Sequence, residues 1–431
     1  MKSKERKEWV WERKGRAWVF LVVSLLLVSC TAPGPSPSSL RLVFKSGKIF
    51  GKPEILRSLL DQFEKENPGI RVVEETLPSS SDEQHQFYVT SLEGRTPEFD
   101  VFSLDVIWVP EFARAGWLRE LSHLLPEREK QDFFPGPLEA VRFRGTICAL
   151  PWYIDAGVLY FRSDLLEKHG FRPPQTWPDL VRTAQAILAK ERDLYGFLWQ
   201  GKQYEGLVCN ALEYFRSRGG KVLEKGKVAV DSTENLEALS FMRDLIGKYR
   251  ISPPLVTSAA EETTRNIFGN GRALFMRNWP YAWRLLQKEG SPVAGRVGLC
   301  PVPYFPGGKS SPTLGGWQLG VNRYSRHPRE AEKLLVFLAS SASQKFLALS
   351  VGYQPARKSL YQDRELSQAQ PLLPRLYEAF MEARPRPVTP YYMMMTQVLQ
   401  PELSAALSGI KPPQEALRSA RRQMGHILGE E

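Results

Sequence analysis

Strand and helix patterns alternate along the chain from residue 40 onward, and this order limits the possible folds more than any other feature. Residues 40–44 form a short apolar segment typical of a strand. Residues 53–66 then place apolar side chains at helical spacing, with Pro53 suited to the first turn. Residues 70–75 and 99–104 again resemble strands. Strand, helix and strand in this order predict a parallel sheet with right-handed crossovers.

The alternation continues through the rest of the chain. Apolar residues recur at helical spacing over residues 176–191, 231–249, 328–349 and 415–428, and a short strand is predicted at 272–276. About 390 residues follow the first strand-like segment, enough for two lobes of ordinary domain size. The sequence therefore predicts an α/β protein.

The first 30 residues combine a positive leader with a short apolar run. Residues 1–16 carry seven Lys or Arg against three Glu, and residues 17–28 are almost wholly apolar. Such a run rises about 18 Å as a helix, too little for a hydrocarbon core of roughly 30 Å, so it is typical of a secretory signal. The run ends in LVSC, which resembles the bacterial lipobox. That resemblance implies a signal peptide over residues 1–29 and a lipid on Cys30.

The Pro- and Ser-rich residues 30–39 are predicted to be a tether. The protein is accordingly expected in the cell envelope as a membrane-anchored lipoprotein, on the periplasmic face or the cell surface. An ordinary cleaved signal with an incidental Cys30 is the alternative.

Charge and cysteine content narrow the possible partners. The formal net charge is +11, and removing the leader's net +4 leaves about +7, spread along the chain. No basic arm for nucleic acid is present in the sequence, although the excess favours an anionic membrane surface. Cys148, Cys209 and Cys300 lack metal-type spacing, so no metal or other cofactor is expected. They are predicted to be buried thiols, with one long-range disulfide left open.

Five clusters of aromatic, carboxylate, glycine or arginine residues lie at predicted strand ends or in loops. Asp105 follows a strand of alternating apolar residues, where open parallel sheets hold ligand groups. Tyr153 and Asp155 lie two apart in an extended segment and therefore project to one face. The other members are Asp100, Trp279 and Tyr281 in NWPYAW, Gly315, Gly316 and Trp317 in GGW, and Arg384 and Arg386 in RPRP.

Each cluster also has a purely structural explanation. Asp105 can cap the helix predicted over residues 106–115, and Tyr153 and Asp155 fit a strand with one solvated face. Single aromatic residues commonly pack in cores, paired glycines occur in turns, and exposed basic loops are usual. Together, however, the clusters favour a ligand with apolar faces that stack on aromatic rings and hydroxyl edges that bond to Asp and Arg. A neutral carbohydrate has both features.

An ordered set of motifs covers about residues 40–428: DQFEKENPGIRV, FDVFSLDVIWVPEFARAGWL, LPWYIDAGVLYFRSDLL, GNGRALFMRNWPYAW, LGGWQLGVNRYSRHPREAEKLLVFLAS and RPRPVTPYY. With these motifs the chain resembles the family 1 extracellular solute-binding proteins of ABC sugar importers, in particular the trehalose- and maltose-binding members. The resemblance implies sugar contacts at Asp105, Tyr153, Asp155, Trp279, Tyr281, Gly315, Gly316, Trp317 and Arg386.

One stretch departs from the family pattern. Many relatives place an acidic or polar contact in the loop that corresponds to SGKIFGKPE, whereas in this chain Lys48 and Lys52 occupy it and Glu54 is the only acid. This departure leaves the identity of the sugar and its anomer open. Residues 79–81 form a second candidate edge of the site.

The resemblance also implies a two-lobed periplasmic-binding-protein fold of the type II kind. It places residues 40–150 and 300–350 in an N-terminal lobe and residues 151–299 and 360–431 in a C-terminal lobe, with the ligand cleft between them. The lobes are expected to close on the ligand, and the closed form to dock on a permease. A monomeric, non-catalytic receptor for a disaccharide such as trehalose or maltose is the resulting expectation.

Three other functions remain open on the sequence alone. A glycosidase would use Asp105 and Asp155 as a carboxylate pair, which requires a defined separation that a sequence does not give. A receptor for a glycerophosphodiester or another polyol would use Lys48, Lys52, Arg384 and Arg386 for the phosphate. A surface lipoprotein without a ligand is the third possibility.

Overall fold

The computed structural model describes residues 39–48 and 54–430. The chain divides into two units, Met1–Ser39 and Leu40–Glu431, and every described helix and strand belongs to the second unit. The predicted signal peptide, Cys30, Lys52 and all of the tether except Ser39 lie outside the described residues.

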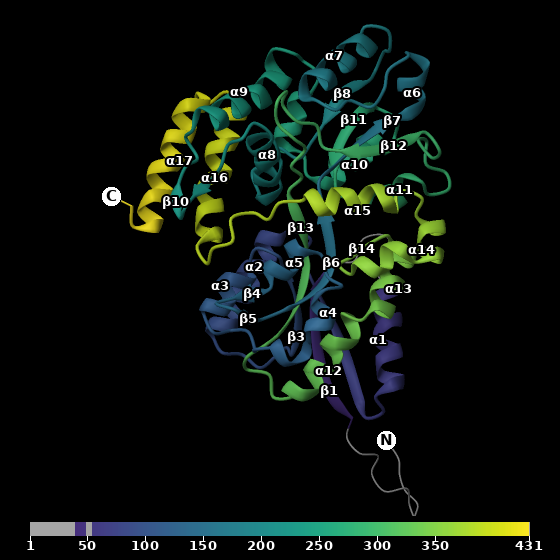
Figure 1. Ribbon diagram of the computed structural model, residues 1–431, viewed down its shortest axis with the longest axis vertical. Helices are drawn as coiled ribbons and strands as arrows, with labels where there is room; N and C mark the ends of the chain where they lie inside the picture. Colours follow the sequence, from purple (N-terminus) through teal and green to yellow (C-terminus); the bar gives the residue numbers. More distant parts are fainter. Residues whose placement is uncertain (1–38, 49–53, 431) are drawn as a thin grey trace, which may run out of the picture. The chain divides into compact units, whose positions relative to one another are not determined.

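Two β-sheets organise the second unit, with the six-stranded sheet in the lower half of Figure 1 and the four-stranded sheet in the upper half. In spatial order the first contains β14 (Gln354–Pro355), β6 (Leu150–Ala156), β13 (Leu314–Val321), β3 (Val101–Asp105), β1 (Leu40–Gly47) and β2 (Ile70–Leu77). The second contains β12 (Val297–Pro301), β7 (Val158–Arg162), β11 (Ala273–Asn278) and β8 (Tyr195–Leu198). Two hairpins complete the strands: β4 (Arg142–Phe143) with β5 (Thr146–Ile147), and β9 (Leu223–Glu224) with β10 (Lys227–Val228).

Helices cover these sheets. In chain order the α-helices are α1 (Glu54–Glu66), α2 (Ser81–Glu93), α3 (Val109–Arg114), α4 (Glu127–Lys130), α5 (Pro135–Ala140), α6 (Ser163–Lys168), α7 (Trp177–Leu188), α8 (Glu205–Ser217), α9 (Thr233–Gly247), α10 (Glu261–Gly269), α11 (Ala282–Leu286), α12 (Pro328–Leu338), α13 (Ser341–Val351), α14 (Arg364–Ala369), α15 (Leu373–Glu382), α16 (Tyr392–Leu407) and α17 (Pro413–Leu428). Short 3-10 helices occupy Ser122–Leu124 (η1), Pro254–Ser258 (η2) and Lys358–Gln362 (η3).

The predicted parallel start of the fold is confirmed. β1 pairs in parallel with both β2 and β3, and the connecting helices are α1 and α2. α1 buries Leu56, Leu59, Leu60 and Phe63, so its apolar spacing serves to cover the sheet. β13 then inserts beside β3 in the antiparallel direction and carries the sheet on to β6.

The chain passes between the two sheets more than once. β6 pairs in the six-stranded sheet, and after Gly157 alone the chain continues as β7 in the four-stranded sheet. The segment between β12 and β13 returns to the first sheet. The buried apolar residues form two separate clusters, one packed around each sheet. The α/β architecture and its two lobes are therefore as the sequence predicts.

Two helices differ from their predictions. The helix predicted over residues 328–349 is two helices, α12 and α13, separated at Ala339 and Ser340. α3 begins at Val109 with Trp108 in the cap position, so Asp105 is not its N-cap. Asp105 instead accepts the backbone N–H of Ile107 at 3.2 Å in the turn before the helix. The Thr176 hydroxyl caps α7 by accepting the Asp179 N–H at 3.2 Å.

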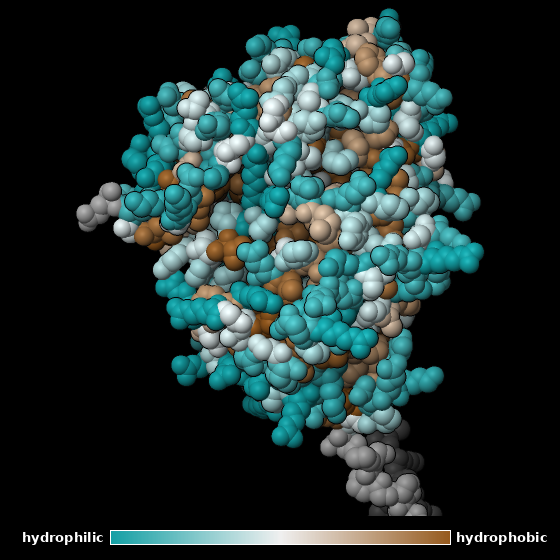
Figure 2. Space-filling model, viewed as in Figure 1, coloured by the Kyte–Doolittle hydropathy of each residue, from teal (hydrophilic) through white to brown (hydrophobic). Residues whose placement is uncertain are grey.

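Two further features concern the surface and the thiols. Figure 2 shows that the face in view is mainly hydrophilic, with apolar residues scattered over it. Within residues 39–48 and 54–430 no single helix is long and apolar enough to cross a membrane, and α12 and α13 reach that length and composition only as a pair bent by 55°.

Cys148, Cys209 and Cys300 are free thiols; the first two are buried and Cys300 is half-buried.

Candidate ligand-binding site

A cavity of about 320 Å³ is lined by residues from both sheets and their helices, a volume within the usual range for small-molecule sites. All nine residues that the sequence predicts as ligand contacts line it: Asp105, Tyr153, Asp155, Trp279, Tyr281, Gly315, Gly316, Trp317 and Arg386. Lys48 and residues 79–81 also line it, as the predicted edges of the site. Residues far apart in sequence thus meet at one cavity.

Strand register brings the first group together. Trp317 on β13 lies opposite Asp105 on β3 and opposite Tyr153 on β6, so the three residues form a row across neighbouring strands. Gly315 lies opposite Asp155 in the same pairing. Tyr153 and Asp155 are half-buried while their neighbours along β6 are buried, which confirms that they share one face.

The paired glycines allow close packing at this point. Gly316 has a φ of +117°, and a Cβ there would lie 2.5 Å from the carbonyl oxygen of Tyr153. A Cβ on Gly315 would lie 3.1 Å from Cζ3 of Trp279. Gly316 therefore requires glycine, for its backbone conformation and for the approach of Tyr153, whereas a Cβ on Gly315 would push the Trp279 ring by a few tenths of an ångström.

The aromatic side chains are held at their edges or on one face. Tyr153 packs on Tyr353 with ring centres 4.4 Å apart, and Trp317 meets Trp108 edge to face at 5.5 Å. On the opposite side, the Trp279 Nε1–H donates to Glu261 at 3.2 Å and the Tyr281 hydroxyl donates to Glu262 at 2.8 Å. Trp279 and Trp317 are each half-buried, so part of each ring remains open to the cavity.

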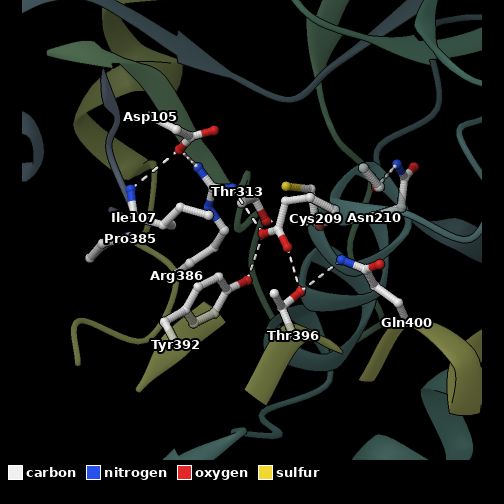
Figure 3. Close-up of polar contacts among 12 residues, drawn as sticks. Asp105, Ile107, Cys209, Asn210, Thr313, Pro385, Arg386, Tyr392, Thr396 and Gln400 are labelled. Carbon is white, nitrogen blue, oxygen red and sulfur yellow. Dashed lines mark hydrogen bonds and ion pairs between the residues drawn. The ribbon is translucent and has the colours of Figure 1, made fainter. Parts of the chain in front are cut away.

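Arg386 pairs with two carboxylates that line the cavity, Asp105 and Glu205, and Figure 3 shows its contact with Asp105. Its Nη2 donates to Oδ1 of Asp105 at 2.6 Å, and its Nη1 donates to Oε1 of Glu205 at 2.9 Å. Arg386 is 4% exposed, so both ion pairs are shielded from water. Arg384, two residues earlier, is exposed and is not among the residues lining the cavity. The structure thus distinguishes two arginines that the sequence places in similar settings.

Glu205 begins α8 and collects donors from three side chains. Besides Arg386, the Tyr392 hydroxyl donates to Oε1 at 2.7 Å and the Thr396 hydroxyl donates to Oε2. Burial raises the pKa of Glu205 above its usual value, although Arg386, Thr396 and Tyr392 oppose the change. This acid is therefore a structural tie at the cavity wall, with its lone pairs already in use.

Asp155 is the carboxylate that remains available. It forms no hydrogen bond with any other residue of the described part of the chain, and it faces the cavity from β6. Burial raises the pKa of Asp155 to about 8, with Arg277 acting in the opposite direction and Asp105 adding to the increase. Hydroxyl donors from a ligand would supply the missing hydrogen bonds and favour the ionised form.

Several lining residues were not predicted from the sequence. They include Gln84, Ser103, Lys202, Tyr204, Glu205, Glu261, Glu262 and Tyr353. Tyr204 and Glu205 lie at the start of α8, and Glu261 and Glu262 in the first turn of α10. Acidic residues in a first helical turn are common for reasons of helix stability, so this pattern alone does not indicate a ligand site. Asp100 lies away from the cavity, where it accepts the Val43 N–H at 2.8 Å.

The site contains carboxylates but no metal-type cluster. In residues 39–48 and 54–430 no three His, Cys, Asp or Glu side chains are grouped so as to hold a metal ion. The arrangement combines aromatic faces and a carboxylate without a described hydrogen-bond partner around a partly open cavity. Such an arrangement binds a small polar molecule with apolar faces.

Comparison with known proteins gives the family. Residues 51–345, more than half of the chain, match the bacterial extracellular solute-binding protein family. A Deinococcus radiodurans protein named "Probable ABC transporter-binding protein" is 38% identical over 363 residues, which are 82% of this chain and 86% of the relative.

Solved structures agree with this result. The maltose-bound structure of T. maritima MalE3 is 41% identical with a TM-score of 0.86, and the match covers 90% of this chain and 99% of that one. An ABC transporter solute-binding protein from Thermotoga lettingae bound with α-D-tagatose is 27% identical with a TM-score of 0.82, covering 91% and 100%. The two-lobed fold, the cavity between its sheets and these relatives together show that the chain belongs to the bacterial extracellular solute-binding protein family.

Proposed function

We propose that the protein binds a sugar, a disaccharide such as maltose or trehalose, in this cavity and delivers it to the permease of an ABC importer. The observation that supports this most directly is the placement of nine predicted contacts, four of them aromatic side chains, around one cavity of about 320 Å³. Aromatic faces stack on the C–H faces of pyranose rings, and Asp155 accepts from hydroxyl groups at their edges. The maltose-bound relative at 41% identity supports the same ligand class.

A thermal-shift screen with maltose, trehalose, tagatose, mannitol and glycerophosphodiesters tests the ligand. A ligand that binds only the folded state adds about 2.7 kcal/mol to the free energy of unfolding at 100 times its Kd, and it therefore raises the melting temperature. We expect maltose or trehalose to give a clear increase. No shift with any sugar or polyol would count against the proposal, and turnover of the sugar during incubation would favour an enzyme instead.

The phosphate-binding alternative loses two of its four predicted cations in the structure. Of the four cations that it requires, Arg384 does not line the cavity and Arg386 is paired with two carboxylates. Lys52 lies outside the described residues, which leaves Lys48 at the edge, and Lys202 is a further cation that lines the cavity. Binding to a neutral sugar should weaken little as salt concentration rises, whereas binding to a phosphodiester should weaken strongly.

Substitution of two cavity residues tests the proposed site. We expect Trp317→Ala and Asp155→Ala each to remove most of the sugar affinity, because the first deletes an aromatic face and the second deletes the free carboxylate. Losses of about 2 kcal/mol or more, or roughly 30-fold in Kd, are typical of such central contacts. Arg384→Ala is the matched control outside the cavity. Calorimetric titration measures all three, and near-native affinity in both cavity variants would refute the site.

We further propose that Cys30 carries the lipid that holds the receptor at the membrane. Two independent sequence features support this: the short apolar run before LVSC and the Pro- and Ser-rich segment after it. Replacement Cys30→Ala is expected to release the protein from the membrane fraction and to abolish incorporation of labelled palmitate, while sugar binding is unchanged. Continued labelling of the variant would show that another residue is acylated, and no labelling of the native protein would show that the anchor is absent.

A further inference from the structure

A fully buried ion pair lies directly behind the cavity wall. Arg277 on β11, 1% exposed, donates from Nε to Oε2 of Glu213 at 3.0 Å and from Nη2 to Oε1 at 2.5 Å. Gly157 leaves room for the pair, since a Cβ there would lie 2.0 Å from Oε1 of Glu213. Burying two charges usually adds little net stability compared with apolar side chains. The position of this pair therefore calls for a role other than stability.

The guanidinium of Arg277 supports the ring of Trp279. Its central carbon lies 4.1 Å from the ring centroid, within the range of a cation–π contact. Trp279 lines the cavity but Arg277 is not among the lining residues, so the guanidinium covers a part of the ring turned away from the cavity. Glu261 holds the indole N–H, and Gly315 lies against the far edge of the six-membered ring. The ring is thus fixed on three sides while its remaining surface faces the cavity.

The same guanidinium lies beside the strand that carries Asp155, since a Cβ on Gly157, two residues further along the chain, would lie 2.6 Å from Nη2 of Arg277. Burial is the main influence on the Asp155 pKa, and Arg277 is the cation that opposes it. Asp105 adds to the increase from β3. The other titratable groups that interact with Asp155 are Tyr153 on β6, Tyr160 on β7 and Tyr361 on η3, all neutral phenols at physiological pH. Arg277 therefore packs on the ring of Trp279 and also lowers the pKa of Asp155.

We propose that Arg277, held by Glu213, is a positioning residue of the ligand site that orients the Trp279 ring and supplies the positive charge behind Asp155. This inference rests on the proposed sugar-binding function. Arg277 contacts no ligand itself, because it lies behind the cavity wall. Its effect on affinity passes through Trp279 and Asp155.

A neutral double variant tests the role without leaving a lone buried charge. Arg277→Met combined with Glu213→Gln removes one charge of each sign. We expect the Kd for maltose to rise about 10-fold, because the ring loses its support. We also expect the pH midpoint of maltose binding to move upward, because the cation that favours ionised Asp155 is gone.

Two further variants separate the parts of this role. Arg277→Lys keeps a positive charge but lacks the planar fork, so it should retain the pH midpoint and still bind maltose more weakly. The matched control Arg162→Met with Asp164→Asn removes an ion pair of 2.6 Å between β7 of the same four-stranded sheet and α6, outside the cavity. That control should leave both the Kd and the pH midpoint unchanged, whatever its effect on melting temperature.

A double-mutant cycle with Trp279→Leu shows whether Arg277 acts through the ring. In that background the neutral substitution of the pair should change the Kd by less than about 3-fold. Equal losses with and without Trp279→Leu would overturn the inference, as would a native Kd and pH midpoint in the folded neutral variant. If the native protein bound no sugar at all, the proposed function would fail and the inference with it. Native binding with unaffected variants would sink the inference alone.

Discussion

The carboxyl group of Asp155 lacks hydrogen-bond donors in the ligand-free protein, and a bound ligand could supply them. It faces the cavity without a hydrogen bond from another described residue, while the neighbouring Asp105 receives the guanidinium of Arg386 and the N–H of Ile107. A buried carboxyl without donors favours its neutral form. The ionised form of Asp155 is therefore unfavourable in the ligand-free protein, and hydroxyl groups of a ligand can stabilise it by donating hydrogen bonds.

The effect of Asp155 on the stability of the folded protein can be tested by varying the pH. The pKa of Asp155 is raised to about 8 in the folded protein, against about 3.9 in an unfolded chain. The folded state then binds the proton more tightly, so the stability linked to Asp155 is present below about pH 4 and is lost as pH rises toward about 8. Asp155→Asn removes this titration. We expect the variant to melt above the native protein near pH 8, with the difference shrinking toward pH 4.

Asp164 provides the matched control for this experiment. Burial raises the pKa of Asp164, but the hydrogen bond and charge of Arg162 outweigh burial and hold it below its usual value. Its contribution to stability is therefore present at neutral pH and is lost as pH falls. Asp164→Asn should lower the melting temperature near pH 7, the opposite sign to Asp155→Asn. Equal pH dependence of the native protein and Asp155→Asn would contradict the assignment.

At the scale of elements, the break between α12 and α13 shows what helical periodicity alone does not reveal. Apolar spacing continues across residues 328–349, yet Ser340 takes an extended backbone and caps α13 by accepting the Ser343 N–H at 3.2 Å. The freed carbonyl of Ala339 accepts from Gln344 at 3.0 Å and from Arg357 at 3.1 Å. The helix therefore ends because side chains satisfy its last carbonyls.

Removal of the cap tests this explanation. Ser340→Ala deletes the hydroxyl that accepts the Ser343 N–H, and N-cap losses of this kind cost about 1 kcal/mol. We expect a corresponding fall in the free energy of unfolding, measured by urea denaturation, with an unchanged Kd for sugar because the break lies outside the cavity lining. Ser341→Ala, one residue later, is the control and should have a smaller effect. A stability loss of equal size in both variants would argue against the cap.

The sequence predicted local order and residue type well but not the pairing between distant elements. The spacing of apolar residues predicts β1, α1, β2 and β3, because each of these elements has its apolar face within one short stretch of sequence. The row of Asp105, Trp317 and Tyr153 depends on strand register between segments far apart in sequence. Glu205 escaped prediction because its partners lie 181, 187 and 191 residues away. Only the folded chain gives that acid its surroundings.

At the scale of the whole molecule, Arg386 ties together two parts that each have a core of their own. Asp105 ends β3 of the six-stranded sheet, whereas Glu205 begins α8, whose side chains pack into the cluster around the four-stranded sheet. Family members of this fold bind ligand by lobe movement about hinge segments. Because Arg386 donates to both Asp105 and Glu205, it favours the arrangement in which these two carboxylates lie close together.

Loss of this tie should be visible in solution. Arg386→Ala leaves Asp105 and Glu205 facing each other without a cation, and breaking a buried pair in this way typically costs about 3–5 kcal/mol. Separation of the two sides relieves that repulsion by admitting water. We therefore expect a larger radius of gyration by small-angle scattering without ligand, and a weaker Kd for sugar. Arg384→Ala, an exposed neighbour outside the cavity, should match the native protein in both measurements. Circular dichroism separates opening from unfolding, and a folded Arg386→Ala protein with native radius and native affinity would refute the role of the tie.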